Sequence, residues 1–259
     1  MPATDLPLLL DAARMAGRVA TSFAGKAARR WDKPDGAGPV TEADMAVNHM
    51  LVTILRAARP DYGWLSEETE DTAERLDRAR VFVVDPIVGT RSFVEGSKTW
   101  AHSLAVVEQG EVSAAVIFLP QRDLIYAAAR GEGATLNGAP IAATEVGTAA
   151  EATVLAARPA MQAHLWRSGA PAFTRSYRPS LAYRLGLVAE ARFDGMLTLR
   201  PSWEWDIAAG CLIVSEAGGI CSDRAGRPLR FNNPSPLLDG VIAAGASLHA
   251  ELLAALTPA

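Results

Sequence analysis

The stretch Val81-Phe82-Val83-Val84-Asp85-Pro86-Ile87-Val88-Gly89-Thr90-Arg91-Ser92-Phe93 decides how the rest of the chain is interpreted. Its first four residues are apolar and mostly β-branched, which predicts a strand buried on both faces. Asp85-Pro86 ends that strand, because proline cannot donate a hydrogen bond to the sheet. Gly89-Thr90 then lets the backbone turn and present N–H groups. Such a carboxylate beside such a turn suits a metal ion next to a phosphate, and a plain strand-to-helix turn with a capping Asp is the alternative.

The composition is that of a globular protein without a strong bulk charge. The chain has 259 residues, of which 49% are hydrophobic and 21% charged, and its net charge is −4. This length provides one large domain or two modest ones with a substantial core. Because the balance is acidic and no basic tail is present, we expect no nucleic-acid polymer as a partner.

The cysteines and the first residues indicate in which cellular compartment we expect the protein. Cys211 and Cys221 are ten residues apart, with no CxxC pattern, so we expect free thiols in a reducing environment. The first residues lack the charged start and apolar core of a signal peptide. No apolar run approaches the roughly 20 residues that span a bilayer. We therefore expect a soluble, cytoplasmic protein without a membrane partner.

Apolar spacing predicts two helices before the opening stretch. The first carries one apolar stripe, formed by Leu9, Ala13, Ala16, Ala20 and Phe23. The second begins at the N-cap Thr41, with Asp44 three residues on as in a capping box. Its expected core positions are Val47, Leu51, Ile54 and Ala58. Residues 31–39 predict a mobile loop, and residues 69–80 predict an acidic surface segment.

Strands dominate the first half of the chain, and strands alternate with helices in the second half. A short strand is expected at 61–66, and an antiparallel meander is expected at 103–108, 112–119 and 124–128. Beyond residue 150 we expect strands at 153–157, 196–199 and 240–244, and helices at 160–167, 181–191, 206–217 and 247–256. This alternation of strands and helices is typical of α/β proteins. We place a boundary near residue 140, so that an N-terminal α+β domain (1–140) carries the signature and an α/β domain (141–259) completes the site.

Acidic residues recur at the ends of predicted elements. They are Asp44, Glu67, Asp85 and Asp206. Carboxylate oxygens of this kind suit Mg²⁺, Mn²⁺ or Ca²⁺. Each has a structural alternative, since Asp44 could be a helix cap, Glu67 a solvated surface acid, and Asp206 a complement to a helix dipole. Their joint occurrence around the Asp85 turn favours a site for a divalent cation.

Four motifs together resemble the inositol monophosphatase superfamily of Mg²⁺-dependent, lithium-sensitive phosphatases. That family's signature Asp-Pro-Ile/Leu-Asp-Gly-Thr-x-x-Phe is matched at 85–93 except at position 88, and its Trp-Asp-x-Ala-Ala-Gly is matched at 205–210. Val-Thr-x-Ala-Asp at 40–44 and Ser-Glu-Glu at 66–68 precede them in the family's order. The resemblance covers nearly the whole chain. It implies an α/β (α+β) fold, layered α-β-α-β-α, and a homodimer.

The resemblance also implies a metal set. Glu67 and Asp85, with the Ile87 carbonyl, resemble the ligands of the first metal, and Asp85 and Asp206 resemble ligands of the second. The family binds two or three Mg²⁺ ions and is inhibited by Li⁺. Where its signature has a second Asp, this chain has Val88, whose side chain offers no oxygen. We expect a weakened second site, because even residues that only support ligands change affinity or activity by ~10–100-fold.

The same resemblance assigns residues to catalysis. Thr90, with Glu67, resembles the pair that orients the attacking water. The Gly89 and Thr90 amides resemble the cradle of the phosphate. Asp44 resembles an acidic neighbour of Thr90. No covalent nucleophile is required, because metal ions activate water and screen the phosphate oxygens.

The substrate is specified less sharply. Ser180 and Arg184 lie where the family's substrate-facing helix starts, with Pro179 where glycine is common. Asp206 is expected to touch the substrate as well. Arg184 is basic where nucleotidase-type members tend to carry lysine, so it could reach a second phosphate; an ordinary surface arginine is the alternative. Lys33 belongs either to a lid that covers the substrate or metal, or to a flexible loop without such a role.

We therefore expect a Mg²⁺-dependent phosphomonoesterase that hydrolyses a small phosphorylated metabolite, by default inositol monophosphate, through a metal-activated water. A 3′(2′),5′-bisphosphate nucleotidase and a histidinol-phosphate phosphatase are alternatives within the same chemistry. A non-catalytic relative that binds a phosphorylated ligand is an alternative of another class, and Val88 is the feature that favours it.

Overall fold

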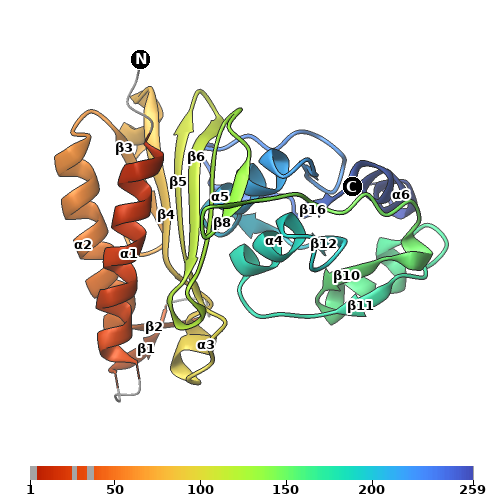
Figure 1. Ribbon diagram of the computed structural model, residues 1–259, viewed down its shortest axis with the longest axis horizontal. Helices are drawn as coiled ribbons and strands as arrows, with labels where there is room; N and C mark the ends of the chain where they lie inside the picture. The colour runs from red at the N-terminus through yellow and green to blue at the C-terminus, as the bar shows by residue number, and fades with distance from the viewer. Residues whose placement is uncertain (1–4, 25–27, 34–37, 259) are drawn as a thin grey trace.

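The computed structural model arranges its helices and sheets in five layers (Figure 1). The residues described are 5–24, 28–33 and 38–258. Helices α1 (Leu6–Phe23) and α2 (Glu42–Ala58) cover one face of a seven-stranded sheet. Helices α4 (Leu181–Ala189) and α5 (Glu204–Glu216) lie between this sheet and a five-stranded sheet, whose far side carries α6 (Ala246–Ala255). The order α-β-α-β-α confirms the predicted fold class.

The seven-stranded sheet explains the apolar run at its second strand. Its strands, in spatial order, are β3 (Gly63–Ser66), β4 (Arg80–Val88), β5 (Ala101–Glu108), β6 (Glu111–Leu119), β7 (Leu124–Ala129), β8 (Ala134–Leu136) and β9 (Ala139–Ile141). Only β3 and β4 are parallel, so the predicted antiparallel meander is confirmed. Phe82 and Val84 pack toward α1 and α2, whereas Val81 and Val83 pack toward α4 and α5. Both faces of β4 are therefore buried, which is why its sequence does not alternate.

The five-stranded sheet mixes parallel and antiparallel pairs. Its strands, in spatial order, are β11 (Thr174–Ser176), β10 (Thr153–Ala156), β12 (Gly195–Thr198), β16 (Val241–Ala244) and β14 (Ile220–Ser222). The other short elements are β1 (Arg30–Asp32), β2 (Pro39–Thr41), α3 (Thr90–Val94), β13 (Ser202–Trp203), β15 (Leu237–Leu238) and the 3₁₀ turns η2 (Ala73–Asp77), η3 (Pro120–Arg122), η4 (Ala149–Glu151), η5 (Arg158–Met161) and η6 (Ala163–Leu165). In the described part of the chain, no helix is long and apolar enough to cross a membrane.

The start of α2 follows the predicted capping chemistry. Thr41 Oγ1 accepts hydrogen bonds from the amides of Ala43 and Asp44, and Asp44 Oδ2 accepts one from the Thr41 amide at 2.8 Å. The expected core stripe is wrong at its end, because Ala58 is exposed and Leu55 is fully buried. The stripe continues in steps of four from Leu51, as the helical period requires.

Three other expectations need correction. Residues 31–39 are not simply a loop, because Trp31 and Asp32 belong to β1, which pairs with β2; residues 34–37 lie outside the described part. Residues 160–167 form the 3₁₀ turns η5 and η6 and no α-helix, because Gln162 between them is extended (φ −65°, ψ 133°). The segment 69–80 is not all surface, because the Arg75 side chain is buried. The two cysteines, in contrast, are free thiols as expected.

Helices α4 and α5 cross at a glycine. A Cβ placed on Gly210 would lie 2.5 Å from Leu185 Cβ and 2.4 Å from its Cδ1. Real Cβ atoms do not approach so closely, so only glycine permits this crossing. The crossing matters for the site, because α4 begins beside Ser180 and α5 carries Asp206 in its first turn.

We predict that Gly210→Ala destabilises the protein. Alanine in a helix gains up to about 1 kcal/mol over glycine, whereas overpacking a core costs about 1–3 kcal/mol. The clash involves Leu185 Cβ rather than the flexible end of a side chain, so we expect a net loss of roughly 1–2 kcal/mol. Urea unfolding measures it. Gly147→Ala is the control, since Gly147 is exposed and its added Cβ would meet nothing within 4 Å. Equal unfolding midpoints for both variants would contradict the argument.

Candidate active site

The predicted site residues line one cleft, with one exception. The cleft has a volume of about 900 Å³ and is lined by residues that include Glu67, Asp85, Ile87, Val88, Gly89, Thr90, Ser180, Arg184 and Asp206. Asp44 lies behind this lining and contacts Thr90. The residues come from the ends of β3 and β4, the turn before α3, and the starts of α4 and α5. The fold thus brings together side chains that are more than a hundred positions apart.

Parallel pairing places Glu67 beside Asp85. Ser66 is paired with Val84 across β3 and β4, and the Glu67 amide donates to the Val84 carbonyl at 3.3 Å. The two carboxylates therefore leave the same edge of the sheet. Asp206 reaches this edge because Ser103 Oγ on β5 donates to the Trp205 carbonyl at 2.8 Å, which fixes the first turn of α5 against the sheet.

The three carboxylates lie close together and repel one another; Asp85 is buried, and Glu67 and Asp206 are partly buried. Burial raises the pKa of Asp85 well above its usual range, and Glu67 and Asp206 raise it further. Burial also raises the pKa of Asp206 to about 7, with Glu67 adding to the shift. Ionised carboxylates in such a place are stable only beside a compensating cation. The cluster is thus chemically suited to a divalent cation with oxygen ligands.

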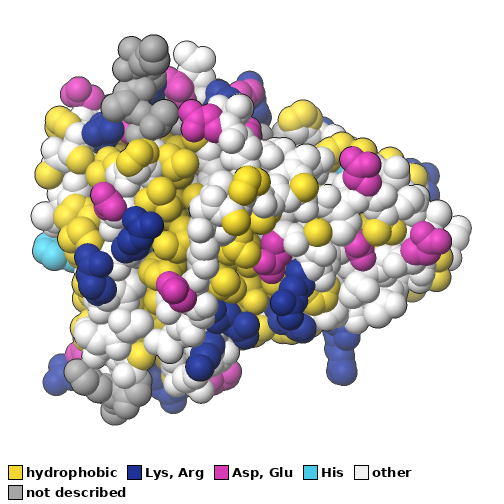
Figure 2. All heavy atoms as spheres, viewed as in Figure 1, with side chains coloured by type: hydrophobic (Ala, Val, Ile, Leu, Met, Phe, Trp, Pro, Cys, Tyr) yellow, Lys and Arg dark blue, Asp and Glu magenta, His cyan; other side chains and the backbone are white. Residues whose placement is uncertain are grey.

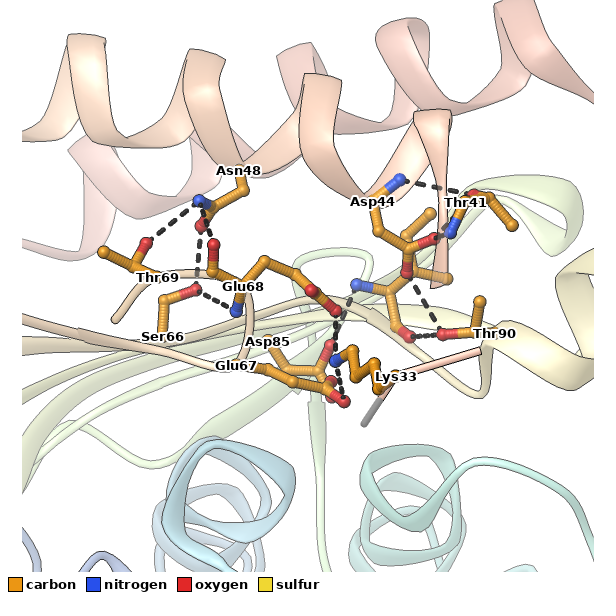
Figure 3. Close-up of polar contacts among 11 residues, drawn as sticks. Lys33, Thr41, Asp44, Asn48, Ser66, Glu67, Glu68, Thr69, Asp85 and Thr90 are labelled. Carbon is orange, nitrogen blue, oxygen red and sulfur yellow. Dashed lines mark hydrogen bonds and ion pairs between the residues drawn. The ribbon is translucent and has the colours of Figure 1, made fainter. Parts of the chain in front are cut away.

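The turn after β4 is built around glycine and a hydrogen-bonded threonine. The Ile87 amide donates to Asp85 Oδ1 at 2.9 Å, and Gly89 adopts the left-handed conformation (φ 99°). Thr90 Oγ1 then lies 3.1 Å from Asp44 Oδ1 and 3.3 Å from the Ile87 carbonyl (Figure 3). Asp44 is therefore both a helix cap and a neighbour of the site. Burial raises the pKa of Asp44, and its hydrogen bonds from Thr41 oppose this shift.

Lys33 enters the site as an ion-pair partner. Its Nζ lies 2.8 Å from Glu67 Oε1 and 2.6 Å from Glu68 Oε1 (Figure 3). Burial alone would lower the pKa of Lys33, but the two carboxylates outweigh it and raise the pKa. Burial raises the pKa of Glu68 to about 7, although Lys33 opposes that shift. The sequence indicated a loop lysine here and gave no signal for this pairing.

A small network fixes the turn that carries Glu67. Ser66 Oγ donates to Asn48 Oδ1 at 2.8 Å, and Asn48 Nδ2 donates to the Glu68 carbonyl at 3.2 Å and to Thr69 Oγ1 at 3.0 Å (Figure 3). Asn48 lies on the buried face of α2. The turn is therefore held against α2 independently of Lys33. No local pattern in the sequence marks Asn48 as part of the site.

Val88 contributes packing instead of an oxygen. It is 2% exposed, belongs to the core between the first sheet and helices α4 and α5, and is paired with Ala101 of β5. In the part of the chain that the structure describes, no three His, Cys, Asp or Glu side chains already surround one point as a metal ion would require. The donors for one cation are present, but Glu67 is engaged by Lys33, and a carboxylate at position 88 is missing.

The wall opposite the turn comes from α4. Ser180 Oγ accepts a hydrogen bond from the Tyr183 amide and caps α4. Arg184 is 8% exposed, so it is not an ordinary surface arginine. Its Nε donates to the Arg178 carbonyl at 2.5 Å, and its guanidinium lies 4.4 Å from the centre of the Tyr177 ring.

A buried histidine supports the signature turn from behind. His102 Nδ1 lies 2.5 Å from the Pro86 carbonyl, and the ring is fully buried between Trp100 and Phe118. Burial lowers the pKa of His102 to about 4, so the ring is neutral and Nδ1–H donates. The contact joins residues 16 positions apart, and the sequence analysis found no role for this histidine.

Comparison with known proteins agrees with this geometry. The model of the "Inositol monophosphatase family" matches residues 5–259. An inositol-1-monophosphatase of Rhizobium meliloti is 34% identical over 209 residues, which are 73% of this chain and 74% of that protein. A histidinol-phosphatase of Chlorobaculum parvum is 29% identical over 260 residues, 97% of this chain and 96% of that protein. The crystal structure of the extragenic suppressor protein suhB from Bartonella henselae superposes with a TM-score of 0.81, at 28% identity and 96% coverage of both chains.

We predict that, because of His102, the free energy of unfolding decreases as the pH falls. The unfolded ring titrates near 6.5 and the folded ring near 4, so below 6.5 the unfolded state takes up the proton first. Between about pH 7.5 and about pH 5 this costs about 2 kcal/mol of unfolding free energy. Urea unfolding at both values should show a smaller pH dependence in His102→Gln than in the native protein. His49→Gln, on the exposed side of α2, is the control. The same pH dependence in His102→Gln and the native protein would show that the ring is not held neutral.

Proposed function

Because the chain belongs to the inositol monophosphatase family, we propose that it is a metal-dependent phosphomonoesterase acting on a small phosphorylated metabolite. The observation that carries the proposal is the crowding of three carboxylates, one buried and two partly buried, beside the Gly89–Thr90 turn in one cleft. Inositol monophosphate is the default substrate, in keeping with the Rhizobium relative. Histidinol phosphate is the alternative, in keeping with the Chlorobaculum relative.

The residues that would hold the cation are those of the cleft lining that offer oxygen ligands. They are Glu67, Asp85, the Ile87 carbonyl and Asp206, and Mg²⁺ is the proposed ion, with Li⁺ as an inhibitor. The chemistry that such an ion supplies when bound is a water of lowered pKa and neutralised charge on the phosphate. Lys33 Nζ is paired with Glu67 Oε1, so its ammonium would repel a divalent cation and compete with it for this carboxylate.

Thr90 and Asp44 provide the protein's own contribution to hydrolysis. A P–O bond to water forms as the ester P–O bond breaks; one water proton leaves the attacking oxygen, and the leaving oxygen takes up a proton from solvent to depart as an alcohol. The Thr90 hydroxyl can donate to Asp44 Oδ1 and accept a hydrogen bond from that water through its free lone pairs. The raised pKa of Asp44 makes it a better proton acceptor than an ordinary Asp. Glu67, on the other side of the turn, would orient the same water.

A non-catalytic role is the second candidate, and Val88 is the observation that favours it. A colourimetric phosphate-release screen over inositol monophosphate, histidinol phosphate and adenosine 3′,5′-bisphosphate, with and without Mg²⁺, separates the two. Mg²⁺-dependent release from any of them supports the phosphatase. Silence on every substrate while calorimetry still detects binding of the same compounds would establish the non-catalytic reading.

We predict that Val88→Asp increases both metal affinity and activity. The new carboxylate adds a ligand where the side chain now offers only methyl groups, so we expect at least a tenfold rise in kcat/KM at a fixed Mg²⁺ concentration. Calorimetric Mg²⁺ titration should show tighter or additional binding. Val88→Ala is the control, because it removes bulk without adding oxygen. An Asp variant with the native rate and native metal affinity would contradict the proposal.

We also predict that Lys33→Met tightens Mg²⁺ binding. The variant removes an ammonium that competes for Glu67, and a partly exposed pair of this kind corresponds to roughly twofold to fivefold in affinity. Lys98→Met, at an exposed position, should bind Mg²⁺ like the native chain. Weaker binding in Lys33→Met would instead show that the lysine organises the carboxylates for the ion.

A further inference from the structure

Strand β4 contains a β-bulge at the point where it enters the cleft. Its pairing with β5 shifts register between two pairs, Asp85 with Ser103 and Val88 with Ala101. Between these pairs, Pro86 and Ile87 of β4 lie opposite a single residue of β5, His102. Bulges beside functional sites re-aim side chains and leave backbone groups without a partner in the neighbouring strand.

The extra residue determines which side chains of β4 face the cleft. In a regular strand Asp85 and Ile87 would share one face, and Val88 would lie on the other. Instead, Ile87 packs into the core that α1 and α2 cover, and Val88 packs into the core that α4 and α5 cover. Asp85 faces α5, because its carboxylate lies close enough to Asp206 to be repelled by it. The bulge therefore turns position 88 to the same side as Asp85.

A side chain supplies the hydrogen bond that β5 does not supply to the bulge through its backbone. The Pro86 carbonyl lies 2.5 Å from His102 Nδ1. Because a carbonyl only accepts hydrogen bonds, Nδ1 must carry the proton and donate it. His102 is itself held in the sheet, since it is paired with Phe118 of β6 on its other side. One imidazole thus connects the bulge to the middle of the sheet.

The other nitrogen of this ring has no partner. Among the described residues, none forms a hydrogen bond with His102 Nε2, which is fully buried. Aromatic rings enclose the imidazole instead, with centre-to-centre distances of 5.5 Å to Trp100 and 6.2 Å to Phe118. A buried lone pair without a donor destabilises the folded chain, and an apolar side chain in this place would avoid that cost. The contribution of the imidazole is therefore its Nδ1–H.

The bond from His102 acts on Asp85 through a single peptide group. The Pro86 carbonyl and the Ile87 amide belong to the same planar peptide, so they can rotate only together. The Ile87 amide donates to Asp85 Oδ1 at 2.9 Å. His102 and the Asp85 carboxylate thus bind opposite ends of one peptide group. Hydrogen bonds at the two ends of such a group strengthen each other, so loss of the imidazole also weakens the bond to Asp85.

We propose that His102 is a positioning residue: its Nδ1–H fixes the Pro86–Ile87 peptide group, and this peptide group holds the Asp85 carboxylate toward the cleft. The inference rests on the proposed function, because Asp85 is there a ligand of the cation. The Ile87 carbonyl, which also accepts from Thr90 Oγ1 at 3.3 Å, is oriented by the same bulge.

The native chain alone tests the first step. Long-range ¹H–¹⁵N spectra identify which nitrogen of a histidine ring carries the proton. We expect the His102 ring to be protonated on Nδ1. A neutral ring protonated on Nε2 could not donate to the Pro86 carbonyl and would overturn the proposal, whatever the variants do.

Amide hydrogen exchange in EDTA tests the second step without a metal ion. His102→Leu fills the place of the ring without a donor, so the Ile87 amide should exchange roughly tenfold faster than in the native chain. His102→Asn should restore most of the protection, because its amide nitrogen is as many bonds from Cα as Nδ1 is. Leu252→Ala, a buried truncation in α6, is the control for lost stability and should not affect Ile87 more than the core strands. Native protection of Ile87 in His102→Leu would overturn the proposal.

Calorimetric Mg²⁺ titration tests the effect on the ligands themselves. His102→Leu should bind Mg²⁺ roughly tenfold to hundredfold more weakly than the native chain, as is usual when a residue that supports a ligand is lost. His102→Asn and Leu252→Ala should both bind with close to native affinity. Native affinity in His102→Leu would overturn the proposal and leave the proposed function standing. A native chain that binds no Mg²⁺ would defeat the proposed function, and the protonated nitrogen and the Ile87 exchange rate then decide the inference.

Discussion

The repulsion among three crowded carboxylates, one buried and two partly buried, is the constraint on which the rest of this structure depends. Asp85 is fully buried and faces Glu67 and Asp206. Placing like charges together in a low-dielectric interior costs several kcal/mol unless a cation compensates them. The chain supplies part of that compensation itself through Lys33, which pairs with Glu67. Such a cluster persists only if the scaffold prevents the carboxylates from turning away, and much of the fold serves that end.

The scaffold holds Asp206 from two directions. On one side, Ser103 of the first sheet bonds the Trp205 carbonyl. On the other side, Glu204, which is fully buried, accepts hydrogen bonds from the Asn232 and Asn233 amides at 2.5 and 2.9 Å. Arg75 in turn donates to Asn232 Oδ1 at 2.6 Å and to the Asn233 carbonyl at 2.8 Å. A 3₁₀ turn of the first half of the chain thus orients the first turn of α5, and residues from both halves line one cleft.

The features that could be predicted are those that residues close together in the sequence determine. The β4 run, the Thr41 cap and the signature turn are each determined within a few positions, so periodicity and turn chemistry suffice. Arg75, His102 and the Lys33 ion pair were missed because their partners lie 16 to 158 positions away. The α-helix expected at 160–167 fails for a related reason. A short stretch with marginal helix propensity takes the conformation that its surroundings impose, and here an extended Gln162 splits it into two turns.

Val88, Arg184 and Arg200 all affect the net charge of the cleft. An Asp at position 88 would add one negative charge that a second cation must offset; valine removes that charge and packs into the core instead. The cleft then offers one ligand fewer to divalent ions, while the guanidinium groups of Arg184 on α4 and Arg200 after β12 line the same cleft. Fixed cations cannot activate water as a metal ion does, but they bind anions without an ion cofactor. A valine at position 88 therefore changes the charge balance of the cleft by one negative charge and leaves its fixed positive charges in place.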